Sequence, residues 1–273
     1  MNMKFYLHEL RRQALSSALW FLFLGAMIVL ILNNFSAISA VTMEALLGFD
    51  FSMFTDEVTE TLHLGFLPDL SEYREYFAFF IQLITVAACC YASNLGIGAI
   101  SRDIDEGTME FLYAQPISKM GILLTKLASR ISALLVFDFG LFLLCVIVSV
   151  NAAPMGAAYM GSMISIFFST FLTHLIFLMI GFCVSSFWSN SAQSSGFSLS
   201  IVLFSVLVGI LAPLSKSTAW LRALSPYHYA VPSEVIRPGY GYPLVGWMML
   251  LLGGVTLFGL AYLRFYKRDL VAR

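Results

Sequence analysis

Charge is scarce in this sequence. Only 11% of its 273 residues are Asp, Glu, Lys or Arg, whereas a soluble globular domain carries about 25%. Hydrophobic residues make up 59% of the chain, and the net charge is −1. A chain of this composition has too few charged side chains to cover a soluble domain, and it lacks the basic surface that nucleic acid binding requires. The composition predicts an integral membrane protein with no nucleic acid partner.

Cysteine is also rare, and its placement argues against a disulfide framework. None of the four cysteines lies in a polar loop, and no CxxC pair with metal-ligand spacing occurs. They all fall inside apolar runs, at Cys89, Cys90, Cys145 and Cys183. We therefore expect small buried hydrophobic residues here and no metal site.

Motifs for catalysis and nucleotide binding are missing. The sequence has no GxxxxGK[ST] phosphate loop and no GxSxG nucleophile elbow. The nearest glycine cluster, Gly96-Ile97-Gly98, has neither a strand before it nor a lysine after it, and with Ala92 it suits close helix packing instead. We expect no catalytic residue and no cofactor site in this chain, so any ATP chemistry must come from another chain.

Six long apolar runs predict an all-α integral membrane protein. A hydrocarbon core about 30 Å thick needs about 20 helical residues, and no segment has the alternating pattern of a transmembrane β-strand. We expect a single transmembrane domain over residues 1–273. Its predicted spans are residues 14–32, 76–100, 120–150, 157–187, 192–211 and 244–265.

The segments outside these spans differ in character. Residues 1–13 place apolar side chains on one helical face and basic ones on the other, which predicts an interfacial helix on the membrane surface. Residues 33–75 are acidic but contain many apolar positions, so we expect short helices or a small subdomain. Residues 214–243 are rich in proline and half apolar, which predicts short helices in a re-entrant-like loop.

The distribution of basic residues predicts the orientation. Six spans place both termini on one side, and eleven of the fifteen Lys and Arg residues fall on that side. The positive-inside rule then puts both termini and the segment 101–119 in the cytoplasm of a cell-membrane protein. A cleavable signal peptide is an alternative for the first run, because small residues follow at 36–40. The run of 19 residues is long for a signal, however, and more spans follow.

Segment 101–119 is the most charged part of the chain and separates two apolar runs. Its charges require water, so we expect it at a membrane face. Thr108 is placed to cap a short helix over residues 109–113, which Pro116 would end. This helix would expose Met109, Phe111, Leu112 and Tyr113. Exposed aromatic and aliphatic residues between charges are typical of a docking element.

An aspartate and a histidine fall deep inside predicted spans. Asp138 lies in the third span and His174 in the fourth. An intramembrane carboxylate is costly unless it is paired or hydrated, so it marks a candidate functional site. Arg130 lies two helical turns from Asp138 on nearly the same face. The structural alternative is an ion pair, or a protonated Asp138 hydrogen-bonded across helices, and both readings stay open at this point.

The charged segment also carries a resemblance. Residues 105–112, Asp-Glu-Gly-Thr-Met-Glu-Phe-Leu, are followed by Gln115-Pro116-Ile117-Ser118. This pattern resembles the permease subunits of type-2 ATP-binding cassette (ABC-2 type) exporters, and the ending at residues 265–270 is similar to theirs. The six-span layout agrees over the whole chain, although only about twenty residues are specific to the motif.

The resemblance implies a function and a set of partners. Two permease subunits, as a homodimer or with a sister permease, would form the substrate pathway in membrane lipid. Two separate cytoplasmic ABC ATPase subunits would bind ATP and Mg²⁺ and dock on segment 101–119, the coupling helix region. The residues expected to couple to the ATPase are Arg102, Asp105, Glu106, Gly107, Thr108, Glu110, Phe111, Leu112 and Pro116.

Two other functions stay open from the residues alone. An ion-coupled secondary transporter would use Asp138 and His174 to bind protons or sodium, but the matching broken helices of inverted repeats are not seen in the sequence. A membrane sensor or immunity protein without transport would use the acidic segment 33–75 to capture a ligand. That function would not explain the exposed aromatic and aliphatic residues of segment 101–119.

Overall fold

The computed structural model describes residues 3–40, 72–114, 117–152, 157–188, 190–211, 217–235 and 244–267. Within these ranges the regular structure is helical, without strands, and six helices are long and apolar enough to cross a membrane. This confirms the prediction of an all-α membrane protein with six candidate spans. The six helices are α1 (Met3–Asn33), α4 (Tyr73–Ile97), α7 (Lys119–Ala152), α8 (Ala157–Phe187), α9 (Ser191–Leu211) and α11 (Leu244–Lys267).

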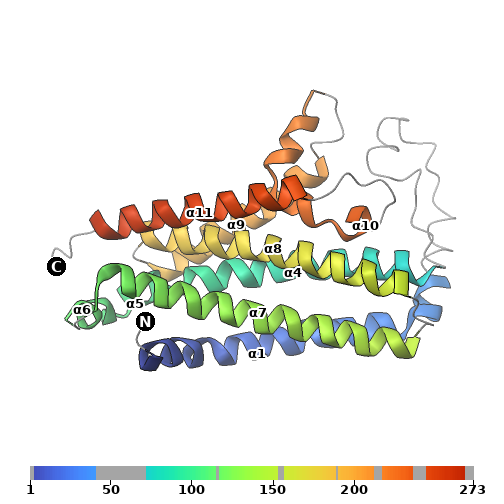
Figure 1. Ribbon diagram of the computed structural model, residues 1–273, viewed down its shortest axis with the longest axis horizontal. Coiled ribbons are helices and arrows are strands. Elements are labelled where there is room, and N and C mark those ends of the chain that lie inside the picture. The colour runs from blue at the N-terminus through green and yellow to red at the C-terminus, as the bar shows by residue number, and fades with distance from the viewer. Residues whose placement is uncertain are drawn as a thin grey trace.

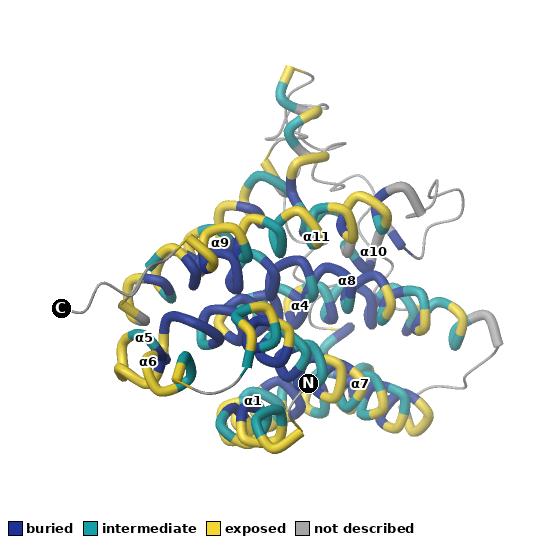
Figure 2. Tube along the Cα trace, turned by 60° about the vertical axis from the view of Figure 1, so that its left-hand side comes forward, coloured by how far each residue is buried: buried dark blue, intermediate teal, exposed yellow. Residues whose placement is uncertain are grey.

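The six long helices run side by side along the longest axis of the molecule (Figure 1). Two short helices, α5 (Ser101–Asp105) and α6 (Thr108–Tyr113), lie at the same end of the bundle as both chain termini (Figure 1). We call this the α5–α6 end. Helices α4 and α8 pass through the middle and have the largest buried share of the six, 61% of an 18-residue window in each, whereas α1, α9 and α11 are largely exposed on their outer faces (Figure 2). The exposed apolar faces suit contact with lipid.

Helices α4 and α8 cross in direct backbone contact at two glycines. A Cβ atom added to Gly96 would lie 2.1 Å from the carbonyl oxygen of Leu178, and one added to Gly181 would lie 2.1 Å from the carbonyl oxygen of Ser93. The expectation that Gly96 serves close packing is therefore correct. Gly98, the other glycine of that cluster, has more room, because its added Cβ would meet no atom closer than 3.8 Å.

We expect Gly181→Ala to destabilise the protein by about 1–3 kcal/mol, because rigid backbone atoms of α4 occupy the space of the new methyl group. The measurement is thermal unfolding of the purified protein in detergent. Gly161→Ala is the matched control on the same helix, since a Cβ there meets nothing within 4 Å. Equal melting temperatures for the two variants would contradict the close crossing.

The predicted surface helix at residues 1–13 is not a separate element, because α1 continues without a break from Met3 to Asn33. Leu7 is 44% exposed, whereas Glu9 and Gln13, which were not singled out, are buried with 2% and 3% exposure. The reason lies on another helix: α7 carries buried basic side chains that need polar partners.

Short helices fill the described part of the segment before α11. They are η4 (Ala219–Leu224), η5 (Pro226–Ala230) and α10 (Pro232–Val235). Tyr227 is buried, and its hydroxyl donates to the carbonyl oxygen of Gln82 on α4 at 3.4 Å. The segment therefore packs into the bundle at this point. The prediction for residues 33–75 falls mostly on residues 41–71, which lie outside the described ranges.

Candidate functional site

The α5–α6 end is shaped by a tight turn. Gly107 joins the two short helices with a φ of +70°, a left-handed conformation that glycine adopts without steric cost. Gly107, and not Thr108, occupies the N-cap position of α6. The predicted Thr108 cap is therefore wrong. Thr108 is the first helical residue, and its hydroxyl donates back to the carbonyl oxygen of Asp103 on α5 at 3.3 Å. This bond links the two short helices.

Helix α6 has one buried face and one exposed face. Met109 is only 2% exposed and inserts into a small core formed by the ends of the long helices. Leu112 and Tyr113 pack against the same core, because residues at i, i+3 and i+4 share one side of a helix. Phe111 is 68% exposed on the opposite side. Of the four apolar residues predicted to be exposed, Met109 is buried and Leu112 and Tyr113 are half-buried. Phe111 is the one that is exposed as predicted.

The residues expected to contact an ATPase also differ in how far they are exposed. The exposed ones are Arg102, Asp105, Glu106, Gly107, Thr108, Glu110 and Phe111, and Leu112 is half-buried. Pro116 lies outside the described residues. The exposed set therefore combines a single large aromatic side chain with a mainly acidic surface.

An ionic network, buried except at Arg12 and Glu106, fixes α5 to α1 and α7. The Asp103 carboxylate accepts hydrogen bonds from Arg12 of α1 and from Lys126 of α7. The Lys126 Nζ atom also lies 2.9 Å from a carboxylate oxygen of Glu9. Arg12 reaches Glu106 at the end of α5 as well. Asp103 is therefore the residue through which α5 contacts both neighbouring long helices.

Arg130 continues the network one turn further along α7. It lies 3.2 Å from Glu9, bonds the Gln13 side chain and donates to the carbonyl oxygen of Gly98 at 2.9 Å. The network then holds three acidic and three basic side chains, and the charges balance. They are Glu9, Asp103, Glu106, Arg12, Lys126 and Arg130. Buried charges are tolerated when each is paired in this way.

The electrostatics of Asp103 follow from this pairing. Burial by itself raises the pKa of the Asp103 carboxyl, but Lys126 and Arg12 outweigh that effect and hold its pKa below the ordinary value of 3.8. Asp103 is therefore ionised at neutral pH. Sequence reasoning missed Glu9, Asp103 and Lys126 as a set. The sequence does hold a hint of part of this set. Glu9 and Gln13 are four residues apart, as are Lys126 and Arg130, so each pair lies on one face of its helix.

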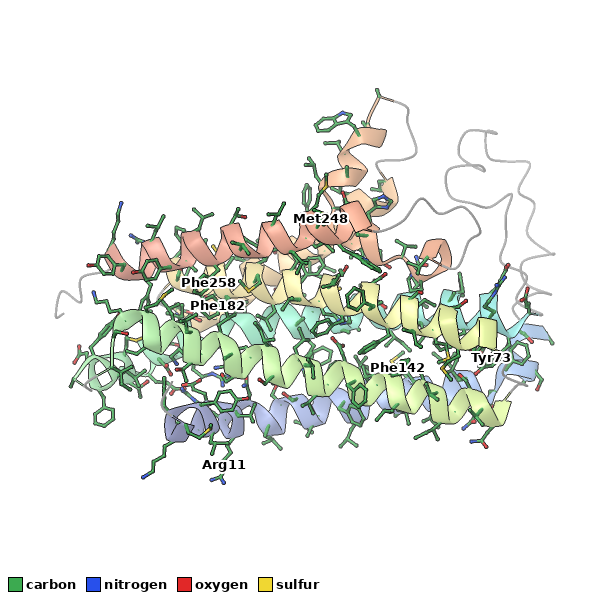
Figure 3. The ribbon with its side chains drawn as sticks, viewed as in Figure 1. Arg11, Tyr73, Phe142, Phe182, Met248 and Phe258 are labelled. Carbon is green, nitrogen blue, oxygen red and sulfur yellow. The ribbon has the colours of Figure 1, made fainter. Side chains whose placement is uncertain are left out.

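Aromatic contacts tie α6 to the end of α11. The Lys119 Nζ atom lies 5.5 Å from the ring centroids of both Tyr113 and Tyr266. The rings of Tyr113 and Phe265 lie 5.8 Å apart. At the same end, Phe182 of α8 stacks on Phe258 of α11 (Figure 3). Helix α6 is thus held by contacts with several long helices.

The intramembrane pair lies elsewhere, near the middle of α7 and α8. The Nδ1 atom of His174 lies 2.9 and 3.1 Å from the two carboxylate oxygens of Asp138. Both side chains are buried. Asp138 does not pair with Arg130, which the spacing had allowed, because Arg130 is engaged by Glu9 and Gln13. Asp138 instead bonds across helices to His174.

Within the described ranges, no group of three or more His, Cys, Asp or Glu side chains lies close enough to hold a metal ion. A search of curated protein sequences gives no significant match. The family model described as "ABC-2 family transporter protein" matches residues 6–270, which is nearly the whole chain and covers the six candidate spans apart from the first three residues of α1. This chain therefore belongs to the ABC-2 family of transporter proteins and is a multi-pass membrane permease of an ABC transporter.

Proposed function

We propose that this permease exports its substrate and is driven by cytoplasmic ATPase subunits that dock on the exposed side of α6. ABC-2 permeases are non-catalytic membrane components that associate with ABC ATPase subunits. Two ATPases would bind ATP and Mg²⁺ and act on two permease chains, either identical or sister subunits. The α5–α6 end would face the cytoplasm of a cell-membrane protein, with both termini on that side.

The observation that carries this proposal is the exposure of Phe111 on a firmly held helix. A large aromatic side chain that is 68% exposed is costly in water and is typical of an interface anchor. Met109, on the other side of α6, is fixed in the core beneath it. A docking residue on a rigid support loses little conformational entropy when a partner binds.

The ionic network supports the step from docking to movement. Asp103 lies on α5, directly before α6 in the chain, and bonds to Arg12 of α1 and Lys126 of α7. A displacement of α6 would therefore reach two long helices through α5. Basic residues support the orientation, because eleven of the fifteen Lys and Arg residues belong to the side that carries both termini.

Phe111→Ala should abolish co-purification of the ATPase while the permease stays folded in the membrane. The measurement is recovery of ATPase subunits with the tagged permease from its native membrane in mild detergent. Trp220→Ala is the matched control, since Trp220 is an equally exposed aromatic residue (65%) on η4, far from α6 in the chain and absent from its contacts. ATPase recovery that is unchanged in Phe111→Ala would contradict docking on α6.

A further inference from the structure

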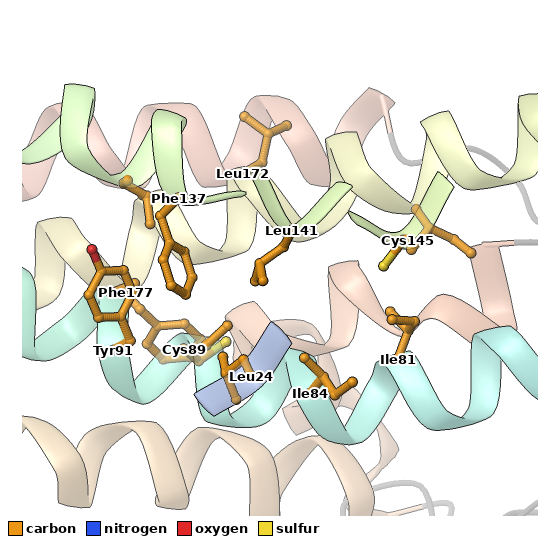
Figure 4. Close-up of a cluster of buried hydrophobic side chains, with 14 of the residues drawn as sticks. Leu24, Ile81, Ile84, Cys89, Tyr91, Phe137, Leu141, Cys145, Leu172 and Phe177 are labelled. Atoms are coloured by element: carbon orange, nitrogen blue, oxygen red, sulfur yellow. The ribbon is translucent and has the colours of Figure 1, made fainter. Parts of the chain in front are cut away.

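An apolar groove lies between α7, α8 and α11. Its volume is about 290 Å³, which gives room for roughly ten methylene-sized groups if each takes the volume of a water molecule in the liquid, about 30 Å³. Leu172 and Ile176 of α8 form part of its buried floor, whereas Leu124 of α7 and Val255 of α11 are exposed at its rims. Leu172 is one of the core side chains drawn in Figure 4, so the groove reaches down to the core of the bundle.

The wall of the groove carries no polar side chain, because all of its residues are Leu, Ile, Met, Val, Phe or Gly. The backbone groups of the three helices are bonded within each helix, so the wall offers a ligand no hydrogen bond. Gly254 of α11 keeps the groove wide. A Cβ atom added there would lie 3.7 Å from Cγ of Met179, and a longer side chain would occupy the groove itself. A hydrocarbon chain is the ligand that such a wall suits.

Apolar and aromatic side chains continue the groove towards the α5–α6 end. On α7, Met120 is exposed and lies one turn before Leu124 on the same face. On α11, Tyr262 and Tyr266 follow Phe258 at successive steps of four residues, and their two rings lie 5.9 Å apart. The eight residues from Phe258 to Tyr266 extend about 12 Å along the helix. The groove is therefore open to an elongated molecule that continues towards this end.

Lys119 places a positive charge where these two rows of side chains end. Its Nζ atom lies 5.5 Å from the ring centroid of Tyr266 and donates to the carbonyl oxygen of Tyr266 at 3.4 Å. Within the described ranges no carboxylate lies within 4.0 Å of this atom. An ammonium group has three donors, so two remain for an anion. Lys119 is also the first residue of α7, whose first turn has no acidic residue, and the positive end of a helix favours an anion.

We propose that this groove binds one acyl chain of an anionic phospholipid, whose phosphate contacts Lys119. Basic pockets between transmembrane helices bind anionic lipid headgroups, and tyrosine side chains such as Tyr262 and Tyr266 suit the membrane interface. A free phosphate ion would lack the contacts with the groove, and a neutral lipid would lack the ion pair with Lys119. The site goes beyond the proposed function, and Phe111, the proposed anchor of the ATPase, is not part of it.

The test is native mass spectrometry of the purified, delipidated permease in detergent, with one lipid added at a time. We expect phosphatidylglycerol to be retained at least tenfold more than a diacylglycerol with the same chains, which has no phosphate. It should also be retained at least fivefold more than phosphatidylcholine, whose headgroup has no net charge. Equal retention of the three lipids would overturn the proposal, because binding would then need no anion.

Lys119→Gln should lower the retention of phosphatidylglycerol at least fivefold, because the variant removes the cation that contacts the phosphate. Retention of diacylglycerol should not change. Lys267→Gln is the matched control, since Lys267 is exposed at the same end of the bundle and does not line the groove. Wild-type retention of phosphatidylglycerol by Lys119→Gln would overturn the assignment of the headgroup to this residue.

Gly254→Leu should fill the groove and lower the retention of phosphatidylglycerol at least tenfold. Gly259→Leu is the matched control on α11, because a Cβ there meets nothing within 4 Å and the residue lies outside the wall of the groove. Wild-type retention by Gly254→Leu would overturn the proposal. Loss of a permease dimer in this variant with lipid retention unchanged would overturn it too, since a second copy would then cover the groove. If Gly254→Leu does not insert, the Lys119→Gln comparison decides.

Discussion

Replacing Lys126 by methionine should lower the free energy of unfolding by about 3–5 kcal/mol, the usual cost of breaking a buried ion pair. Lys126 is fully buried and contacts both Glu9 and Asp103. Its removal would leave two carboxylates facing each other away from water, with too few cations to balance them. The measurement is thermal and chemical unfolding of the purified protein in detergent.

The charge argument has a direct control. Glu9→Gln combined with Lys126→Met removes one charge of each sign, so the double variant should recover most of the lost stability. Lys267→Met removes a lysine from an exposed position at the end of α11 and should change stability little. If the double variant were no more stable than Lys126→Met alone, lost packing rather than lost pairing would explain the effect.

Asp103→Asn should reduce transport at least tenfold while the ATPase still co-purifies. Asp103 is buried and contributes nothing to the exposed docking side of α6, so binding of the partner should persist. Its carboxylate joins α5 to Arg12 and Lys126 by two charge-assisted bonds, and such bonds are about twice as strong as neutral ones. An asparagine would weaken both, so movement of α6 would no longer be passed to α1 and α7. The measurement is substrate export together with ATPase recovery.

A second variant separates this transmission role from a loss of stability. Asp103→Asn with Arg12→Gln restores the balance of charges but not the bridge between the helices. We expect this double variant to regain stability and to remain inactive in transport. Recovery of transport together with stability would show that Asp103 acts only through folding.

Much of the architecture is local, and local patterns predicted it. Apolar runs of about 20 residues fix the number of candidate spans, since a helix is the only structure that satisfies its own backbone in lipid. The segment 101–119 could be predicted to lie at a membrane face with a turn and a short helix. Its charges and its Glu106-Gly107-Thr108 pattern are adjacent in the chain, so no distant contact was needed to find them. The same local reasoning misassigned the buried side of α6 and missed the burial of Glu9 and Gln13 on α1. A helical pattern shows which residues share a face, but it does not show which neighbouring helix buries that face.

The hydrogen-bonding partners of the buried ionisable side chains depend on contacts between residues far apart in the chain. The sequence spacing allowed an ion pair between Asp138 and Arg130, which are eight positions apart on one helix. In the structure Arg130 bonds Gln13 and Glu9 on α1 instead. Asp138 bonds His174 on another helix.

The sequence by itself thus determined six candidate membrane spans and the charged segment 101–119 between two of them, because burial in lipid and exposure to water are set by composition over short windows. Only the tertiary structure decided that Glu9 is buried, that Phe111 is the exposed large apolar residue of α6, and that Gly181 permits the α4–α8 crossing. Each of these depends on which helix lies alongside, and that choice is made by packing and charge pairing over the whole bundle.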